Sequence, residues 1–118
     1  MPFYNSVSRA IGAANSALSQ LYGYNYYQDP STQSNVYVRN NARQTITPAH
    51  DDLKYAVANA RWEGVRASDA RDANRGADYL GSATWSLSDR PNHGYRADVR
   101  AAVDQIRTAI NFLYRAQY

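Results

Sequence analysis

The spacing of apolar residues at the two ends of the chain constrains the fold more than any other feature. Between residues 3 and 22, apolar side chains recur in steps of three and four, as Phe3, Val7, Ala10, Ile11, Ala14, Ala17, Leu18 and Leu21. Residues 93–117 repeat the pattern with Tyr95, Val99, Ala102, Val103, Ile106, Ile110 and Leu113. This spacing aligns apolar side chains along one face of an α-helix, and other helices must cover that face. We therefore predict helices over 3–22 and 93–117 in an all-α helical bundle.

A further helical stretch is predicted over residues 48–88. Thr47 has the side chain of an N-cap, and Pro48 suits the first turn of a helix. Asp51 and Asp52 follow, where carboxylates interact favourably with the positive end of a helix. The sequence therefore places a helix start at Thr47.

The apolar face of this stretch changes side near residues 64–68. The first set is Leu53, Ala56, Val57, Ala60, Gly64 and Ala67, and the second is Ala73, Ala77, Leu80, Ala83, Thr84 and Leu87. Either Gly64 ends one helix and Ser68 caps the next, or one helix of roughly 40 residues extends for about 60 Å. We favour the turn, because it gives four helices of similar length that close a compact bundle. The alternative, three helices with one long central helix, would leave faces for a second copy of the chain to bury.

Small residues recur on both faces of the same stretch. They are Ala56, Ala60 and Gly64 in the first half, and Ala73, Ala77 and Gly81 in the second. A glycine inside a helix costs up to about 1 kcal/mol relative to alanine. We therefore predict that a neighbouring helix backbone comes close at Gly64 and Gly81.

Residues 23–46 lack the helical pattern and are predicted to form a long tyrosine-rich loop, with a short extended piece at 36–38. Five of the 11 tyrosines lie in or beside this segment: Tyr22, Tyr24, Tyr26, Tyr27 and Tyr37. One interpretation is that they cover the core of their own bundle. The other is that they form a contact patch for another subunit, since tyrosine is enriched at protein interfaces. The sequence leaves both interpretations open.

The composition argues against catalysis. The chain of 118 residues contains no cysteine and a single glutamate, which excludes thiolate chemistry and the Glu-x-x-His ligand pairs of ferritin-like bundles. No phosphate loop, EF-hand, dinucleotide fingerprint or nucleophile elbow occurs in the sequence. We predict one non-catalytic domain over residues 1–118, without a cofactor and without a membrane span.

The two histidines, His50 and His93, suggest one metal site. In the four-helix arrangement, the helix that starts at Thr47 runs one way and the next helix returns, so both imidazoles lie at the same end of the bundle. In the long-helix alternative they lie roughly 60 Å apart. Asp51 or Asp89 could then complete a divalent-metal site. The competing interpretation, which we favour, makes His50 a surface residue and His93 a turn or capping residue.

Five arginines are candidates for binding an anion: Arg39, Arg43, Arg96, Arg100 and Arg107. Arginine binds carboxylate or phosphate through two parallel hydrogen bonds, and neighbouring tyrosines can stack on bases. The net charge of +3 is modest for a dedicated nucleic-acid binder. Arg100 and Arg107 are also spaced to pair with Asp104 along one helix.

The last part of the chain has a generic helical-hairpin pattern. It consists of Ala77, Leu80, His93, Arg96, Ala102, Val103, Asp104, Ala109 and Ile110, with an Asp/Asn/Gly-rich connector. Over roughly the last 45 residues this pattern resembles small uncharacterised bacterial helical-hairpin proteins, many of which carry export signals. The resemblance implies a helical fold and export, with any leader already removed, and it implies no activity.

These observations predict a structural role. Copies of the chain are expected to form a homo-oligomer through helix packing and the tyrosine-rich segment. The alternative is a binding module for an anionic polymer, glycan or nucleic acid, and the third possibility is a metal-binding bundle that uses the histidines.

Overall fold

The computed structural model describes residues 2–88 and 96–117. Its elements are α1 (Pro2–Leu21), α2 (Gln33–Asn59), the short 3-10 helix η1 (Ala60–Glu63), α3 (Ala67–Ser86) and α4 (Arg96–Arg115). The described residues contain no β-strand. The prediction of an all-α bundle of four helices is confirmed.

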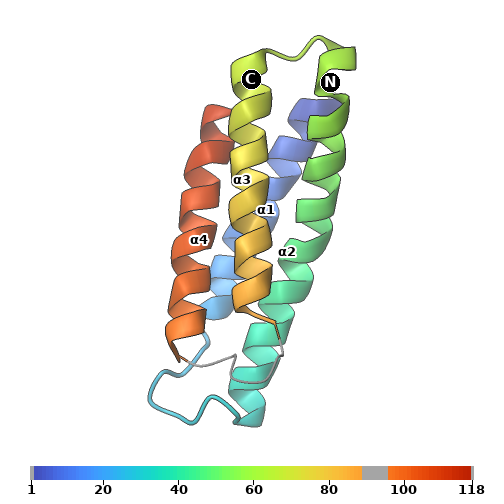
Figure 1. Ribbon diagram of the computed structural model, residues 1–118. Helices are drawn as coiled ribbons and strands as arrows, with labels where there is room; N and C mark the ends of the chain where they lie inside the picture. The colour runs from blue at the N-terminus through green and yellow to red at the C-terminus, as the bar shows by residue number, and fades with distance from the viewer. Residues whose placement is uncertain (1, 89–95, 118) are drawn as a thin grey trace.

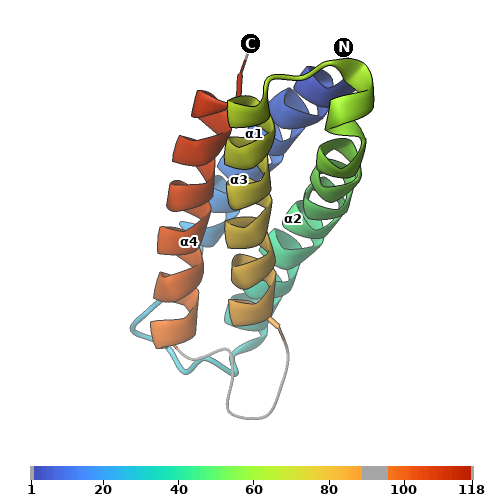
Figure 2. The same cartoon turned by 45° about the horizontal axis from the view of Figure 1, so that its top comes forward.

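The four helices form an elongated bundle in which successive helices run in opposite directions (Figures 1 and 2). Each helix packs against its two neighbours around the ring, α1 on α2, α2 on α3, α3 on α4, and α4 on α1. The bundle measures 49 × 23 × 17 Å along its principal axes. We call the end that carries the α1–α2 connection, residues 22–32, the loop end. The opposite end, which carries η1 and residues 64–66, is the turn end.

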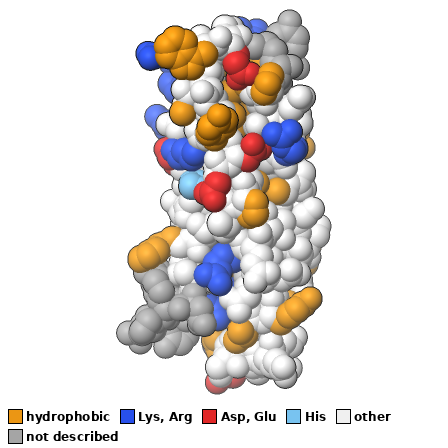
Figure 3. Space-filling view, turned by 90° about the vertical axis from the view of Figure 1, so that its right-hand side faces the viewer, with side chains coloured by type: hydrophobic (Ala, Val, Ile, Leu, Met, Phe, Trp, Pro, Cys, Tyr) orange, Lys and Arg blue, Asp and Glu red, His pale blue; other side chains and the backbone are white. Residues whose placement is uncertain are grey.

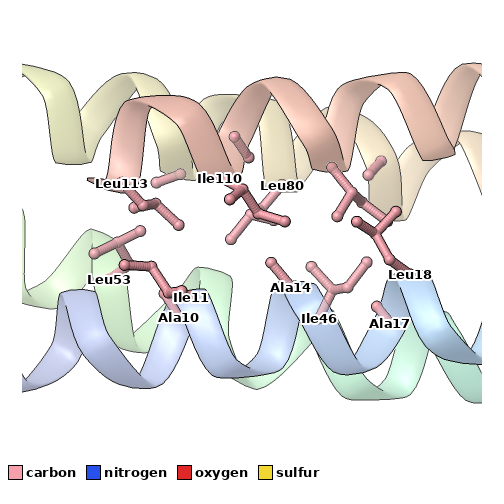
Figure 4. Close-up of a cluster of buried hydrophobic side chains, with 14 of the residues drawn as sticks. Ala10, Ile11, Ala14, Ala17, Leu18, Ile46, Leu53, Leu80, Ile110 and Leu113 are labelled. Carbon is pink, nitrogen blue, oxygen red and sulfur yellow. The ribbon is translucent and has the colours of Figure 1, made fainter. Parts of the chain in front are cut away.

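The core consists of the apolar stripes that the sequence predicts. In Figure 4, Ala10, Ala14 and Leu18 of α1 face Ile110 and Leu113 of α4. Leu53 and Ile46 of α2 and Leu80 of α3 complete this layer, and all three are fully buried. Burying one such aliphatic side chain contributes about 1.5–3 kcal/mol. The many alanines allow the helix backbones to lie close together.

The turn between α2 and α3 is a local structure built around Gly64. Gly64 has φ of +70°, in the left-handed region that glycine adopts at little cost, and it caps η1. The predicted break near residues 64–68 is therefore confirmed. The predicted cap at Ser68 is wrong, because α3 begins at Ala67 and its N-cap residue is Arg66.

The predicted loop over residues 23–46 is wrong in its second half. Helix α2 already begins at Gln33, with the Thr32 hydroxyl accepting a hydrogen bond from the Asn35 backbone N–H (3.4 Å). The extended piece expected at residues 36–38 is helical. The true connection spans residues 22–32, and helix packing overrides the β-preference of the valines and tyrosine.

The predicted helix start at Thr47 is wrong for a related reason. Thr47 and Pro48 lie inside α2, where the Thr47 hydroxyl donates to the Arg43 carbonyl oxygen (2.8 Å) instead of capping a helix. A proline inside a helix removes one backbone hydrogen bond, here the one to the Gln44 carbonyl. Gln44 and Pro48 are both exposed, so water can solvate the freed carbonyl group. The burial of Ile46 and Leu53 on the other face keeps the helix continuous.

Glycine occupies these positions for structural reasons that differ from the predicted close approach of helix backbones. Gly64 ends η1 and approaches no neighbouring helix, since a Cβ there would meet nothing within 4 Å. At Gly81 a Cβ would lie 3.1 Å from His50 Nε2, so this glycine accommodates a side chain and not a backbone. Among the glycines that the structure describes, the tightest position is Gly76, where a Cβ would lie 2.7 Å from Leu113 Cδ2.

Candidate functional site

A buried asparagine organises the loop end. Asn35 is fully buried in the first turn of α2. Its amide nitrogen donates to the carbonyl oxygens of Asn25 (2.9 Å) and Asp29 (3.3 Å), and its Oδ1 accepts from the Asn25 backbone N–H (2.8 Å). These three bonds replace water for backbone groups of the connection and hold its path.

An arginine from α4 holds the other side of the connection. Arg96 donates from Nε to the Tyr26 carbonyl oxygen and from Nη2 to the Gln28 carbonyl oxygen (2.9 Å). Next to these residues, the Asp29 carboxylate accepts hydrogen bonds from the Ser31 hydroxyl (2.6 Å) and the Ser31 backbone N–H (2.8 Å). These bonds lower the pKa of Asp29 below the ordinary value of an aspartate. The connection is therefore an ordered structure built by contacts from two helices.

The structure divides the five tyrosines of this region into two groups. Tyr24 is only 4% exposed and belongs to the core of its own bundle, with its ring edge-on to Tyr26 at 4.9 Å between centroids. Tyr26 is half-buried, and burial raises the pKa of both phenols. Tyr22, Tyr27 and Tyr37 are 71%, 98% and 68% exposed. Tyr24 therefore covers the core of its own bundle. The exposed rings of Tyr22, Tyr27 and Tyr37 remain available for contact with a partner.

A surface pocket of about 450 Å³ opens where the connection meets α4. Its lining residues are Leu21, Tyr22, Tyr24, Tyr26, Arg100, Val103, Asp104 and Arg107. The Arg100 guanidinium stacks on the Tyr26 ring, 4.8 Å from its centroid. The positive charges of Arg100 and Arg107 partly offset the rise that burial causes in the pKa of Tyr26. The pocket combines an apolar floor with charged groups along α4.

The five candidate arginines do not form one surface. Arg39 is 4% exposed and donates from Nη1 to the Ser88 carbonyl oxygen (3.1 Å), so it joins α2 to the end of α3. Arg43 is half-buried. Arg96 holds the connection, whereas Arg100 and Arg107 are exposed and line the pocket. Within the described ranges, no ion pair forms between Asp104 and either of the two pocket arginines.

The turn end contains a polar cluster that the sequence did not reveal. The Tyr4 hydroxyl donates to Asp69 Oδ2 (2.6 Å), and Arg66 Nε donates to the same oxygen (2.9 Å). The side chain of Asp69 is buried. The hydrogen bond to Asp69 raises the pKa of Tyr4, and the carboxylate also raises the pKa of Arg66. No local pattern in the sequence indicates this cluster, because Tyr4 and Asp69 lie 65 positions apart in the chain.

The structure does not reproduce the premise of the proposed metal site. His50 lies in the middle of α2, with its ring over Gly81 and its Nδ1 3.0 Å from Asp51 Oδ1. It is therefore not at the end of a helix that starts at Thr47. His93 and Asp89 lie outside the described residues. Among the residues that are described, no group of three potential metal ligands comes together.

Exposed aromatic side chains concentrate toward the two ends of the bundle. Tyr22, Tyr27, Tyr37 and Trp85 belong to the loop end, and Tyr55, Trp62 and Tyr114 belong to the half of the bundle at the turn end. Figure 3 views the side of the bundle on which α2 lies, and hydrophobic side chains occur there in separate spots with charged groups between them. The described side chains on this side do not form a continuous apolar strip. The exposed aromatic surface is thus placed for contacts near the ends.

Comparison with known proteins identifies no relative. No protein-family model matches the sequence, and neither a curated protein nor a solved structure is found to match it. The resemblance of the last part of the chain to bacterial helical-hairpin proteins, and the export it implies, therefore stay predictions. No helix within residues 2–88 or 96–117 combines the length and apolar character needed to cross a lipid bilayer.

Proposed function

We propose that the protein is a non-catalytic assembly subunit that associates with copies of itself through the exposed tyrosines of the loop end. The observation that carries this proposal is the 98% exposure of Tyr27 on a connection whose backbone is held by Asn35 and Arg96. A large aromatic ring is presented to solvent on an ordered scaffold. Tyr22 and Tyr37 lie in the same region and are also exposed.

The energetics of association favour such an arrangement. Binding costs less when the contact residues are ordered beforehand, because less conformational entropy is lost. A tyrosine buries about 150–250 Å² when it is covered, so three exposed rings supply more than half of the ~800 Å² that each partner buries in a stable interface. Tyrosine is also among the residues that most often dominate the binding energy of an interface.

The decisive experiment measures the mass of the particle as a function of concentration. Sedimentation velocity of the wild type should show an average particle mass that rises with protein concentration. The triple variant Tyr22→Ser, Tyr27→Ser and Tyr37→Ser should weaken association by at least about tenfold, with the helical circular dichroism unchanged.

The matched control replaces the same three tyrosines by phenylalanine. This variant keeps the rings and loses only the hydroxyl groups, so it should still associate. A wild type that stays monomeric at every concentration would refute the assembly role. Loss of helical signal in the serine variant would instead assign these rings to the fold.

The two other roles have weaker support. A binding track for an anionic polymer requires a row of available cations, but Arg39 is buried and Arg96 is used by the connection. A metal-binding role would have to rely on His50 with a single neighbouring carboxylate, Asp51, among the described residues. Retention on heparin resin at low salt, and titration with zinc, test these two roles directly.

A further inference from the structure

The pocket at the loop end has the size and lining of a small-molecule site. Its volume of about 450 Å³ lies within the range of roughly 300–1,000 Å³ in which ligand pockets occur. Leu21 and Tyr24 are buried beneath it, and Val103 is half-buried beside them. An apolar floor of this kind favours a ligand with a flat or apolar body.

The charged groups of the pocket select the sign and number of charges on the ligand. Arg100 and Arg107 contribute two positive charges and Asp104 one negative charge, so the lining carries one net positive charge. Within the described parts of the chain, the Arg107 guanidinium has neither an ion pair nor a hydrogen-bond partner. It is therefore available to bind a carboxylate through two parallel hydrogen bonds. One negative charge on the ligand balances the site.

The aromatic residues define where a ring would lie. Arg100 covers one face of Tyr26, while Tyr22 is largely exposed at the rim of the pocket. A ring placed over Leu21 and Val103 can stack offset against Tyr22, an arrangement worth about 0.5–1.5 kcal/mol beyond the buried area. Its carboxylate would then face α4.

We propose that this pocket binds a small aromatic carboxylate. Arg107 binds the carboxylate group, Arg100 adds to the positive field, and Tyr22 contacts the ring. The site shares Tyr22 with the surface assigned to assembly. Its charged partner, Arg107, does not belong to that surface, and the binding test is therefore made on the monomer.

The test is a two-dimensional NMR titration of the full chain with indole-3-acetate, at a protein concentration where the particle is monomeric. Amide shifts should be confined to residues 21–26 and 100–107, with saturation at or below about 1 mM. Indole-3-acetamide keeps the ring and lacks the charge, and acetate keeps the charge and lacks the ring. Each should bind at least about fivefold more weakly.

Two substitutions with opposite expected effects make the assignment to α4 specific. Arg107→Gln should weaken indole-3-acetate binding at least about fivefold, because it removes the partner of the carboxylate. Asp104→Asn should strengthen binding by about two- to threefold, because it removes a repelling charge. The matched control, Arg71→Gln, makes the same change in net charge at an exposed position of α3 and should leave the affinity within about twofold.

The proposal is overturned if indole-3-acetate causes no shifts up to several millimolar. It is also overturned if Arg107→Gln and Arg71→Gln bind equally well, or if the shifts map outside the pocket. Equal binding of indole-3-acetamide would show that the charge plays no part, and it would refute the assignment of a carboxylate ligand. Failure of this proposal is distinguishable from failure of the assembly role, because Arg107→Gln leaves all three assembly tyrosines in place and the sedimentation experiment measures association separately.

Discussion

The two ends of the bundle solve the same problem, joining antiparallel helices, in different ways. At the turn end, η1 and Gly64 reverse the chain with hydrogen bonds between residues close in sequence. At the loop end, the connection over residues 22–32 depends on a buried amide from α2 and a guanidinium from α4, which lies 68 or more positions away in the chain. The chain reversal at the turn end is thus fixed by local backbone chemistry, with a long-range bond, from Tyr4 to Asp69, beside it. The loop end depends on tertiary contacts.

This difference determines where each end is vulnerable. A change in backbone conformation should affect the turn end, with a cost set by the φ angle of one residue. A change in a buried polar side chain should have its largest effect at the loop end, where it leaves several backbone groups without partners, and a smaller one at the Tyr4–Asp69 bond of the turn end. Substitutions at each end can therefore confirm or contradict the contrast.

The largest effect is expected from Asn35→Ala at the loop end. This change leaves the Asn25 N–H and the Asn25 and Asp29 carbonyl groups without their buried partner. We expect a loss of about 2–4 kcal/mol in the free energy of unfolding, measured by urea denaturation. The control Asn111→Ala, at an exposed position of α4, should change it by less than about 0.5 kcal/mol. Equal effects would mean that the connection does not depend on Asn35.

The second-largest loss in the free energy of unfolding is expected from Tyr4→Phe at the turn end. The change removes the hydroxyl that donates to the buried Asp69 carboxylate, and it should cost about 1–2 kcal/mol. The control Tyr55→Phe, on an exposed ring, should be nearly neutral.

The same bond predicts a pH dependence. Because the pKa of Tyr4 is raised in the folded protein, its contribution is complete below the pKa of the unfolded chain, near 10, and is lost as the pH rises through the folded pKa. The difference in the free energy of unfolding between the wild type and Tyr4→Phe should therefore shrink above about pH 10. A constant difference would contradict the bond.

A smaller effect is expected from Gly64→Ala. Alanine has no clash there, so the cost is the strain of the left-handed backbone, about 1 kcal/mol. The matched control Gly12→Ala, inside α1 with open space around it, should stabilise the protein by roughly 0.5–1 kcal/mol. In thermal unfolding, the midpoint temperature should fall for Gly64→Ala and rise for Gly12→Ala. The same sign for both would contradict the role of Gly64 as a cap.

The smallest effect concerns Asp29 in the connection. Its titration midpoint by NMR should lie below that of an ordinary aspartate, since Ser31 stabilises the charged form. Ser31→Ala should raise the midpoint. Because the pKa of Asp29 is lower in the folded protein, its contribution to stability is present above the pKa of the unfolded state. That contribution is lost as the pH falls through the folded pKa. A midpoint unaffected by Ser31→Ala would mean that the hydroxyl contributes nothing.

The same contrast explains how much of the fold could be predicted from the sequence. Helices α1 and α4 follow from apolar spacing, and the turn follows from the change of face and from Gly64. The start of α2 could not be found in this way. Its buried positions Asn35, Arg39, Ala42 and Ile46 have helical spacing, but the first two are polar and produce no apolar stripe.

The candidate site was predictable in its residues and not in its arrangement. Tyr26, Arg100 and Arg107 were each candidates from the sequence. Their convergence on one pocket depends on the path of residues 22–32, which no local pattern encodes. The burial of Arg39 could not be predicted for the same reason, because its bond partner, the Ser88 carbonyl oxygen, lies 49 positions away in the chain.

Pro48 has a consequence for how the protein opens. The hydrogen-bond ladder of α2 lacks one bond near its middle, so the helix is divided into a loop-end half and a turn-end half. The loop-end half shares its buried contacts with the connection through Asn35. Amide hydrogen exchange is therefore expected to report residues 22–47 as one cooperative unit that opens before the remainder of α2. The segment that bears the exposed tyrosines would then unfold and refold independently of the turn end.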